Sequence, residues 1–378
     1  MLFTLYFFHD LMHNPQSTYV FKRVGVTTKN RLVLAAMTNK QSFDSGRISE
    51  AEIQWLVRRS EGGFGIITTA ATHVSKCGKA WKGEFGVFDD NFIKPLISLT
   101  KRIHYHGSLV IAQLFHGGIR SPEDLTGVQP ISASKVECKE SVSGFSRKAS
   151  EDDIKRIIND FTSAAQRCVE AGFDGVELHG AHGYLISQFL SKTLNQRQDR
   201  WGGDIEGRSR FLIEIIQSIK RHVPKNFIVG VRLSPEIKEL DIILNDTIEL
   251  AKKLKKVEID FIHLSCWDIY ARSIEFPENP KTISEWFVST IGNLPPIIST
   301  GNIWSSEDAS NCMEQGCDFI GVARAAIPYP DWPKNIESKN YHPSRGPFTV
   351  KQLKKVKLSE PFIQYMRKWD GFVKNEPQ

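Results

Sequence analysis

The sequence has few cysteines, and their spacing excludes the common cysteine-based metal sites. Six of the 378 residues are cysteine, and no two of them form a C-x-x-C pair, so neither a zinc knuckle nor an iron–sulfur cluster has its ligands. A secretory signal is also lacking, and we therefore expect reduced thiols, no bound metal and a cytoplasmic protein. The cysteines are Cys77, Cys138, Cys168, Cys266, Cys312 and Cys317.

Long apolar runs are absent as well, which argues against a membrane-spanning helix. The apolar start, MLFTLYFFHD, ends at Asp10, has no basic segment before it and is too short to cross a bilayer. We expect residues 1–19 to form an N-terminal extension. The net charge of +6 arises from mixed charges, and the short basic run KQLKKVK at 351–357 is typical of a solvated helix face. We expect binding to neither membranes nor nucleic acids.

No low-complexity linker and no G-x-G-x-x-G unit divide the chain, so a separate dinucleotide-binding domain is not expected. Instead, short runs rich in Ile and Val alternate with amphipathic stretches from residue 31 to about 337. This alternation favours an α/β fold with a single (β/α)₈ TIM barrel over an open doubly wound sheet, which usually has fewer units. The expected strands are Arg31–Ala36, Gly65–Thr69, Ser108–Leu114, Asp174–Leu178, Phe227–Leu233, Asp260–Ser265, Pro296–Thr300 and Asp318–Val322. The expected helices are Ser49–Glu61, Asn91–His106, Ser150–Ala171, Gly207–His222, Asn245–Val257, Lys281–Gly292 and Ser305–Gln315.

Segments outside the repeating pattern complete the expected domain organisation. Val20–Thr28 (VFKRVGVTT) is typical of a hairpin that could plug the barrel floor, so we place the barrel domain at residues 20–340. Residues 341–378 are expected to form a tail or helix that packs on the barrel. Ile119–Gly144 is long, polar and follows the third strand, which predicts a lid or wall over the barrel mouth.

The residues from His179 to Phe189, HGAHGYLISQF, carry the strongest indication of chemistry. They follow a buried-strand pattern and gather His179, His182 and Tyr184 at its carboxyl end. In a parallel α/β barrel, that end is where the chemistry is done. Two imidazoles can donate hydrogen bonds to a carbonyl oxygen, and a phenol can supply a proton. The alternative interpretation is a pair of structural histidines and a buried tyrosine.

Nine short segments match one known family, in order and each near a predicted strand end. They are KNRLVLAAMT (29–38), GIITTAATHVS (65–75), AQLFHGG (112–118), AGFDGVELHGAHGYLISQFLS (171–191), N-x-R-x-D-x-W-G-G (195–203), E-G-R-S-R-F (206–211), VGVRLSP (229–235), STGN (299–302) and GVARAAIPYPDWP (321–333). Over roughly residues 20 to 335 the chain thus resembles the Old Yellow Enzyme family of FMN-dependent ene-reductases. The resemblance implies a bound FMN and NAD(P)H as hydride donor.

The resemblance also implies catalytic roles. His179 and His182 would hold the activating oxygen of the substrate and stabilise the charge that grows on it, a contribution of roughly 3 kcal/mol for such a donor. Tyr184 would supply the proton. Phe115, Trp267 and Tyr270 are expected to contact the substrate and the nicotinamide as one wall of the site. Ordinary packing is the alternative for all three.

Further residues are implied to bind FMN. Thr38 would hydrogen-bond the flavin O4, and Gln113 would contact the pyrimidine edge. Arg232, in an otherwise apolar strand, would lie beneath N1 and O2, where a buried guanidinium meets an anion; a salt bridge to Glu177 is the alternative. The remaining expected contacts are the backbone of Ala71 and, around the phosphate, Gly301, Asn302, Ala323 and Arg324.

Three positions depart from the family's usual pattern. Ala36 replaces a proline, His182 replaces the asparagine of many relatives, and Ala323 replaces a glycine. The second histidine adds a titratable group, so we expect activity to respond to pH. The methyl group of Ala323 would crowd the phosphate or shift its loop. The 195–203 segment is expected to buttress the loop after the fourth strand.

The resulting hypothesis is an NAD(P)H-dependent FMN oxidoreductase of the ene-reductase or NADPH dehydrogenase type. Hydride would pass from NAD(P)H through flavin N5 to the activated C=C bond of an α,β-unsaturated carbonyl or nitro compound, with ping-pong kinetics. Its partners would be this small molecule and NAD(P)H. The sequence does not decide between a monomer and a homodimer. The first alternative is a flavin-binding barrel with a sensory or scaffolding role and little turnover. The second, a cofactor-free aldolase or isomerase, lacks a good lysine or metal-ligand set at the strand ends.

Overall fold

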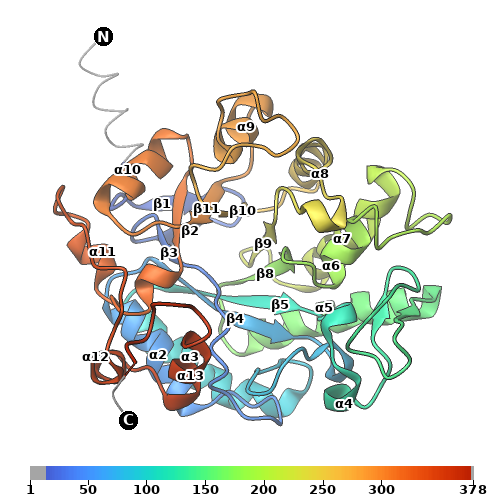
Figure 1. Cartoon of the computed structure of the whole chain (residues 1–378), viewed down its shortest axis with the longest axis horizontal. Coiled ribbons are helices and arrows are strands. Elements are labelled where there is room, and N and C mark those ends of the chain that lie inside the picture. The colour runs from blue at the N-terminus through green and yellow to red at the C-terminus, as the bar shows by residue number, and fades with distance from the viewer. Residues whose placement is uncertain (1–13, 376–378) are drawn as a thin grey trace.

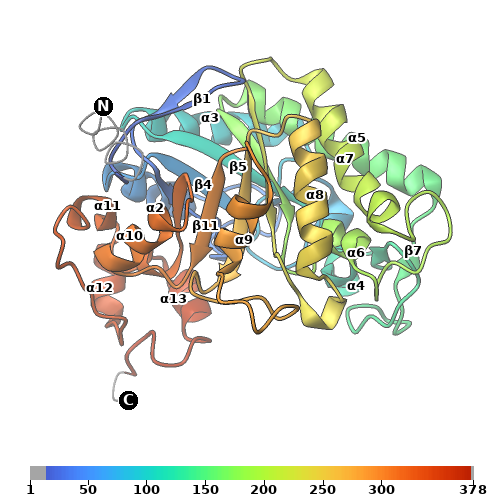
Figure 2. The same cartoon turned by 90° about the horizontal axis from the view of Figure 1, so that it is seen from above.

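The fold is a closed barrel of eight parallel strands. The computed structural model describes residues 14–375, so most of the expected N-terminal extension, residues 1–13 of 1–19, lies outside the described residues. Consecutive strands pair in parallel and the last pairs with the first (Figures 1 and 2). In order around the barrel they are β3 (Leu32–Leu34), β4 (Ile66–His73), β5 (Leu109–Phe115), β8 (Gly175–Gly180), β9 (Ile228–Leu233), β10 (Phe261–Trp267), β11 (Ile297–Gly301) and β12 (Phe319–Val322). The predicted (β/α)₈ barrel is confirmed.

Helices between the strands cover the outside of the barrel and bury their apolar sides against it. Side-chain caps start several of them as the sequence predicts: Ser49 accepts from the backbone of Glu52, and Ser150 and Asp153 form a reciprocal capping box. The covering helices are α2 (Glu50–Glu61), α3 (Ile93–His104), α5 (Glu151–Glu170), α6 (Leu185–Leu190), α7 (Ile205–His222), α8 (Leu244–Lys256), α9 (Ile283–Thr290) and α10 (Ser306–Glu314).

Strand β4 extends four residues beyond its predicted end. The apolar run stops at Thr69, but the strand continues to His73 and all eight of its residues are buried. Polar residues are tolerated there because their hydroxyls are satisfied locally: Thr69 and Thr72 both donate to the carbonyl oxygen of Ala70. A buried-strand pattern read from apolar residues alone therefore underestimates this strand.

The hairpin of β1 (Tyr19–Phe21) and β2 (Val26–Thr28) closes one end of the barrel. Phe21 stacks on Phe319 with ring centroids 5.5 Å apart and lies 6.5 Å from Phe261. The same cluster contains apolar residues from near the amino-terminal ends of the strands, among them Val33, Ile66 and Ile298. The hairpin therefore plugs the floor, as predicted, and leaves the carboxyl ends of the strands for the site.

Two irregular regions pack against the barrel. After β5, the chain forms α4 (Glu123–Thr126) and the short strands β6 (Ile131–Ser132) and β7 (Arg147–Lys148). After β12 it forms α11 (Trp332–Asn335), α12 (Val350–Lys355) and α13 (Glu360–Met366). Phe362 of α13 packs on Trp55 of α2, with centroids 5.3 Å apart, so the C-terminal segment lies against the barrel's helical layer (Figure 1).

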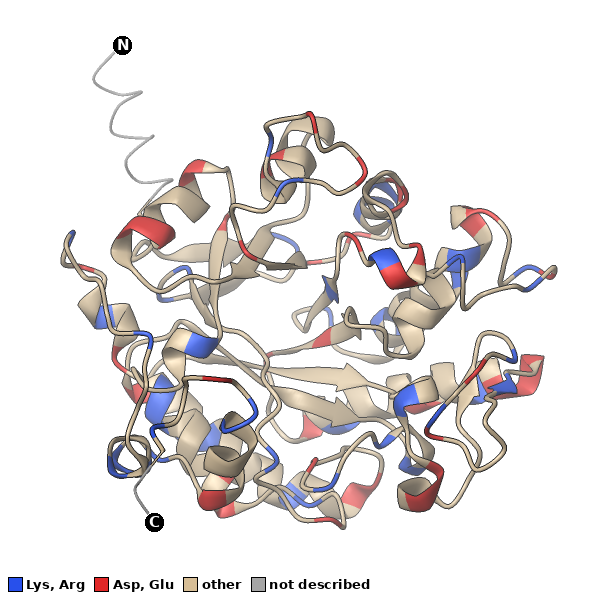
Figure 3. Ribbon diagram, in the orientation of Figure 1, with Lys and Arg blue, Asp and Glu red and all other residues tan. Residues whose placement is uncertain are grey.

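Charged residues of both signs are interspersed over the outer helices and loops (Figure 3). Within residues 14–375, no helix combines the length and apolar character needed to cross a bilayer. In the same residues, no group of three or more His, Cys, Asp or Glu side chains is placed to hold a metal ion.

Candidate active site

A cavity of about 650 Å³ opens at the carboxyl ends of the barrel strands. Its size is within the ordinary range of ligand pockets. Twelve of the residues expected at a functional site line it: Thr38, Ala71, Gln113, His179, His182, Tyr184, Arg232, Trp267, Gly301, Asn302, Ala323 and Arg324. Closure of the barrel thus gathers residues from all eight strands or the loops that follow them.

The two histidines come together because the chain turns sharply after β8. His179 lies in the strand, and His182 adopts a left-handed backbone with φ of 60°. Their ring centroids are 4.9 Å apart. The His182 backbone N–H donates to the Ser234 hydroxyl at 3.1 Å, and its Nε2 contacts the Ser265 hydroxyl at 2.8 Å. Nδ1 of His179 is buried without a hydrogen-bond partner in the described chain and remains free to bind a ligand.

Both imidazoles are neutral at ordinary pH. Burial is the main cause that holds the pKa of His179 and of His182 well below the usual value, and the positive charge of Arg232 adds to it. A neutral imidazole can still donate a hydrogen bond. The expectation that the second histidine makes activity respond to pH near neutrality is therefore not supported.

Tyr184 precedes α6 and faces the cavity from an aromatic cluster. Its ring centroid lies 5.0 Å from that of His179 and 5.1 Å from that of Phe115. Burial raises the pKa of Tyr184 to about 12, while the nearby positive charge of Arg120 acts in the opposite direction. The phenol is therefore protonated throughout the physiological range and can act as a proton donor.

We expect the acceptor-reducing step to be insensitive to pH between about pH 6 and pH 10. The histidines have lowered pKa values and stay neutral over this range, and Tyr184 has a raised pKa and stays protonated. Stopped-flow rates of this step across the range test the expectation. A His182→Asn variant, which cannot titrate there, should give a profile of the same shape. A wild-type inflection near pH 6.5 that the variant lacks would contradict it.

Arg232 is fully enclosed but has no ionic partner among residues 14–375. Its guanidinium donates to the carbonyl oxygen of Ala36 at 3.0 Å and to the Ser265 hydroxyl at 3.1 Å. Its Nε–H is buried without an acceptor. The charge of Glu177 acts on Arg232 without direct contact. A buried cation without a direct ion pair is costly, so this arginine suits an anionic ligand edge in the cavity.

Glu177, the alternative partner of Arg232, has other contacts. Its oxygens lie 2.6 Å from Nδ1 of His263 and accept from the Gln113 amide at 2.6 Å. Burial alone would raise the pKa of Glu177, but His263 and Arg232 outweigh it and hold the pKa below its usual value. Burial lowers the pKa of His263, so a neutral imidazole donates to the carboxylate. This network fixes the Gln113 amide, whose remaining polar groups can contact a ligand in the cavity.

The loops after β11 and β12 form the other end of the cavity. Asn302 has a left-handed backbone with φ of 53° and donates to the Asp268 carboxylate at 3.2 Å. Arg324 follows Ala323, and its guanidinium lies over the Trp369 ring at 5.7 Å. Ala323 has φ of −109°, a conformation that does not require glycine. The alanine at this position therefore does not occupy the left-handed backbone region that favours glycine.

Three aromatic residues that line or support the cavity could not be found from the sequence: Tyr365, Trp369 and Trp81. Thr38 lies in the loop beyond β3 and hydrogen-bonds to Tyr365, which reaches the cavity from α13. Trp369, in the same C-terminal segment, also lines the cavity. Trp81 covers Phe115, with centroids 5.4 Å apart. Aromatic residues in loops carry no strand-end signal, so only their packing reveals them.

Two residues expected to contact substrate do not line the cavity. Phe115 is completely buried beneath Trp81 and Tyr184, so it supports the site from below. Tyr270 points to α10, where its hydroxyl donates to Asp308 at 2.9 Å. Trp267 does line the cavity and is 72% exposed, which leaves its ring available for stacking.

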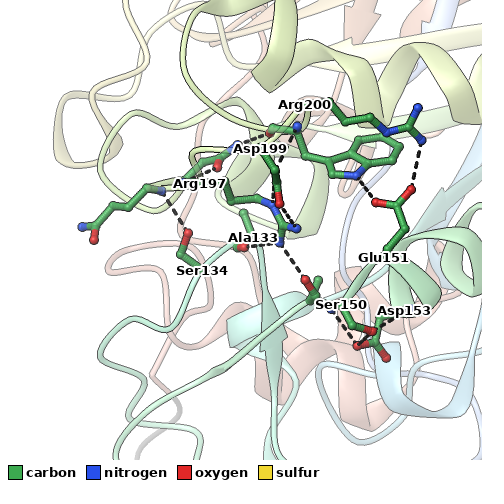
Figure 4. Close-up of polar contacts among 12 residues, drawn as sticks. Ala133, Ser134, Ser150, Glu151, Asp153, Arg197, Asp199 and Arg200 are labelled. Carbon is green, nitrogen blue, oxygen red and sulfur yellow. Dashed lines mark hydrogen bonds and ion pairs between the residues drawn. The ribbon is translucent and has the colours of Figure 1, made fainter.

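The 195–203 loop takes part in a network of polar contacts (Figure 4). The Arg197 guanidinium donates to the carbonyl oxygens of Ala133 and Ala149 at 2.9 and 2.6 Å and forms a two-point contact with Asp199. The Trp201 indole N–H donates to Glu151 at 2.6 Å. These contacts tie the chain after α6 to the β6–β7 region, which follows the third strand, whereas we expected from the sequence that this segment supports the loop after the fourth strand.

Replacement of Arg197 by methionine is expected to destabilise the protein by about 2–4 kcal/mol, because two buried carbonyl oxygens lose their donor. Urea unfolding would measure the loss. Arg200→Met is the matched control, because the Arg200 side chain is 52% exposed and its ion pair with Glu151 is solvated. A similar loss for both variants would show that the buried contacts are not what stabilises this loop.

Comparisons with known proteins agree with this geometry. The model of the NADH:flavin oxidoreductase / NADH oxidase family matches residues 21–342. A Bacillus subtilis protein named as a probable NADH-dependent flavin oxidoreductase is 33% identical over 95% of this chain and 99% of its own. The NADPH dehydrogenase of Bacillus licheniformis is 32% identical over 91% of this chain and 96% of its own.

Solved structures and longer relatives complete the comparison. The old yellow enzyme homologue from Zymomonas mobilis superposes with a TM-score of 0.77 at 26% identity, covering 90% of this chain and 96% of that one. Some relatives are much longer. The chain spans 32% of the NADH:acrylate oxidoreductase of Vibrio harveyi, to which it is 35% identical over 82% of its own length.

Proposed function

Because this chain belongs to the NADH:flavin oxidoreductase / NADH oxidase family and is therefore an NAD(P)H-dependent oxidoreductase with FMN as its cofactor, we propose that it reduces an activated C=C bond. The acceptors would be α,β-unsaturated carbonyl or nitro compounds. The observation that carries the proposal is the grouping of two neutral imidazoles and one protonated phenol at one cavity.

The cavity has the groups that FMN requires. Arg232, with its unpaired buried Nε–H, suits the N1 and O2 edge, and Gln113 and Thr38 would contact the rest of the ring's polar edge. Arg324 and the backbone after Gly301 would hold the phosphate. When bound, FMN supplies the two-electron chemistry, taking a hydride from NAD(P)H and giving it to the acceptor.

The chain's own groups would act on the acceptor. His179 and His182 donate hydrogen bonds to its carbonyl or nitro oxygen and stabilise the negative charge that develops there. Tyr184 gives a proton to the carbon next to the activating group. The raised pKa of Tyr184 means that this proton is present at the start of each turnover.

Ping-pong kinetics would follow if NAD(P)H and the acceptor use the same binding position. The imidazoles, the phenol and Arg232 all face the same cavity, and the sequence contains no G-x-G-x-x-G unit for a separate nucleotide domain. NAD(P)H and the acceptor would therefore occupy this position in turn. The alternative of a sensory barrel depended on crowding by the methyl group of Ala323. Ala323 and Arg324 both line the open cavity, and no contact of the described residues favours that alternative.

The test is a visible absorption spectrum of the purified protein before and after anaerobic NADPH, followed by 2-cyclohexenone. We expect a flavin band that NADPH bleaches and the enone restores, with parallel lines in a double-reciprocal plot. A yellow protein that is bleached by NADPH but not restored by any enone or nitroalkene would contradict the proposed acceptor class. A protein that stays colourless after incubation with FMN would contradict the binding residues.

A further inference from the structure

A third arginine, Arg120, lines the cavity, and the expected FMN contacts do not use it. The lining residues include Arg120, Arg232 and Arg324, and none of the three forms an ion pair with a carboxylate in residues 14–375. Arg232 and Arg324 lie where the two anionic parts of FMN are expected. Arg120, in the short helix Gly118–Arg120 after β5, remains without an anion.

The position of Arg120 is set by the residues that would handle the acceptor. Its guanidinium lies 4.6 Å from the centroid of the Tyr184 ring and donates to the carbonyl oxygen of His182 at 2.9 Å. The carbonyl uses one nitrogen, NH1. Arg120 is solvent-exposed, and its Nε–H and NH2 groups have no acceptor in the described chain. These two groups form a two-point donor edge that a ligand can reach.

The local charge favours an anion beside Arg120. Among the lining residues the only carboxylate is Glu239, on the loop after β9, and it forms no ion pair with Arg120. His179 and His182 are neutral, so they can hold a neutral carbonyl oxygen but offer no charge to balance a carboxylate. A negatively charged group on the acceptor would therefore be recognised by Arg120 and not by the imidazoles.

We propose that the acceptor carries a free carboxylate close to its activated C=C bond and that Arg120 binds this carboxylate. This inference rests on the proposed function and narrows its substrate class to enones or enoate esters with a carboxylate substituent. The activating carbonyl contacts His179 and His182, the double bond lies beside Tyr184, and the carboxylate meets the guanidinium that stacks on the Tyr184 ring. An arginine suits this role because its planar fork binds a carboxylate at two points.

A phosphate of NAD(P)H is the other anion that could enter the cavity. The nicotinamide ring would occupy the reactive position, and a ribose separates that ring from the diphosphate. Arg120 lies directly against Tyr184, at the reactive end. Its position therefore favours an anion that is only a few bonds from the reacting carbons.

The experiment compares monomethyl fumarate with dimethyl fumarate, which differ by one methyl group and one negative charge. The values of kcat/KM for both are measured with the FMN-loaded wild-type protein, Arg120→Met and Arg120→Lys. We expect the monoester-to-diester ratio to fall about tenfold or more in Arg120→Met. Arg120→Lys keeps the charge but loses the fork, so its ratio should be intermediate. Taking the ratio removes any general effect of the variant on Tyr184 or His182.

A second measurement needs no variant. Raising the ionic strength from about 0.05 to 0.5 M should lower the wild-type kcat/KM for the monoester and leave that for the diester unchanged, because salt screens the ion pair. Suppose that both esters are reduced, that Arg120→Met has the wild-type monoester-to-diester ratio, and that salt does not lower kcat/KM for the monoester. The inference is then wrong and the proposed function stands.

Two further outcomes also overturn it. If Arg120→Met slows reduction by NADPH while the ester ratio is unchanged, the anion at Arg120 is a nucleotide phosphate. If neither ester nor 2-cyclohexenone is reduced by the wild-type protein, the proposed function itself fails together with the inference.

Discussion

The Tyr184→Phe variant is expected to reduce enones about 100-fold more slowly, or slower still, while NADPH bleaches it at the wild-type rate. The phenol supplies a proton only when the acceptor is reduced, so its loss affects that half-reaction alone. The ring itself packs against Phe115 and Trp81, and phenylalanine keeps these contacts. Stopped-flow absorbance measures the two half-reactions separately.

Tyr270→Phe provides the matched control. It also removes one phenol oxygen, but the Tyr270 hydroxyl is bound to Asp308 outside the cavity. We expect both half-reactions of this variant to be close to wild type. Equal slowing of both half-reactions in Tyr184→Phe would remove Tyr184 from its role as proton donor and assign it to FMN binding or packing.

The second large effect is expected for Arg232→Met. Arg232 lies in β9, and its buried guanidinium brings a positive charge to the cavity. The flavin edge that it would contact becomes anionic on reduction. Its loss should weaken FMN binding about tenfold or more and lower the midpoint potential by about 30 mV or more, since 30 mV corresponds to about 1.4 kcal/mol for a two-electron couple. An absorbance titration with FMN and a redox titration measure the two quantities.

Arg31→Met is the control for loss of a buried arginine as such. Arg31 lies at the barrel floor, where it donates to Ser17 and to the carbonyl oxygen of Asp318. Its replacement should lower the free energy of unfolding without changing the potential of bound FMN. An Arg232→Met protein that binds FMN at the wild-type potential would show that Arg232 does not contact the N1 and O2 edge.

Local patterns in the sequence were sufficient for the barrel and for much of the site. Eight short Ile- and Val-rich runs predict strands buried on both faces, and only a closed or doubly covered parallel sheet satisfies that requirement. Because parallel strands in a barrel share one carboxyl end, residues that follow different strands must meet there. His179, Arg232 and Arg324 could therefore be placed at one cavity before any contact was known.

Direct contacts between side chains could not be predicted in the same way. Glu177 was a plausible partner for Arg232, but it pairs with His263, which also enters the barrel interior. Phe115 follows the expected strand, yet Trp81 from a loop covers it. In both cases the sequence gives a position along a strand, whereas the choice among neighbouring side chains depends on distances of a few ångströms.

The barrel, its plugged floor and the end at which chemistry takes place follow from the sequence, because periodicity and strand-end composition are local properties. The loop and C-terminal residues that complete the cavity could be identified only from the folded chain. Arg120, Tyr365 and Trp369 reach it from segments without a periodic signal. Their contribution depends on how those segments fold back over the barrel, and that is set by packing between residues far apart in the chain.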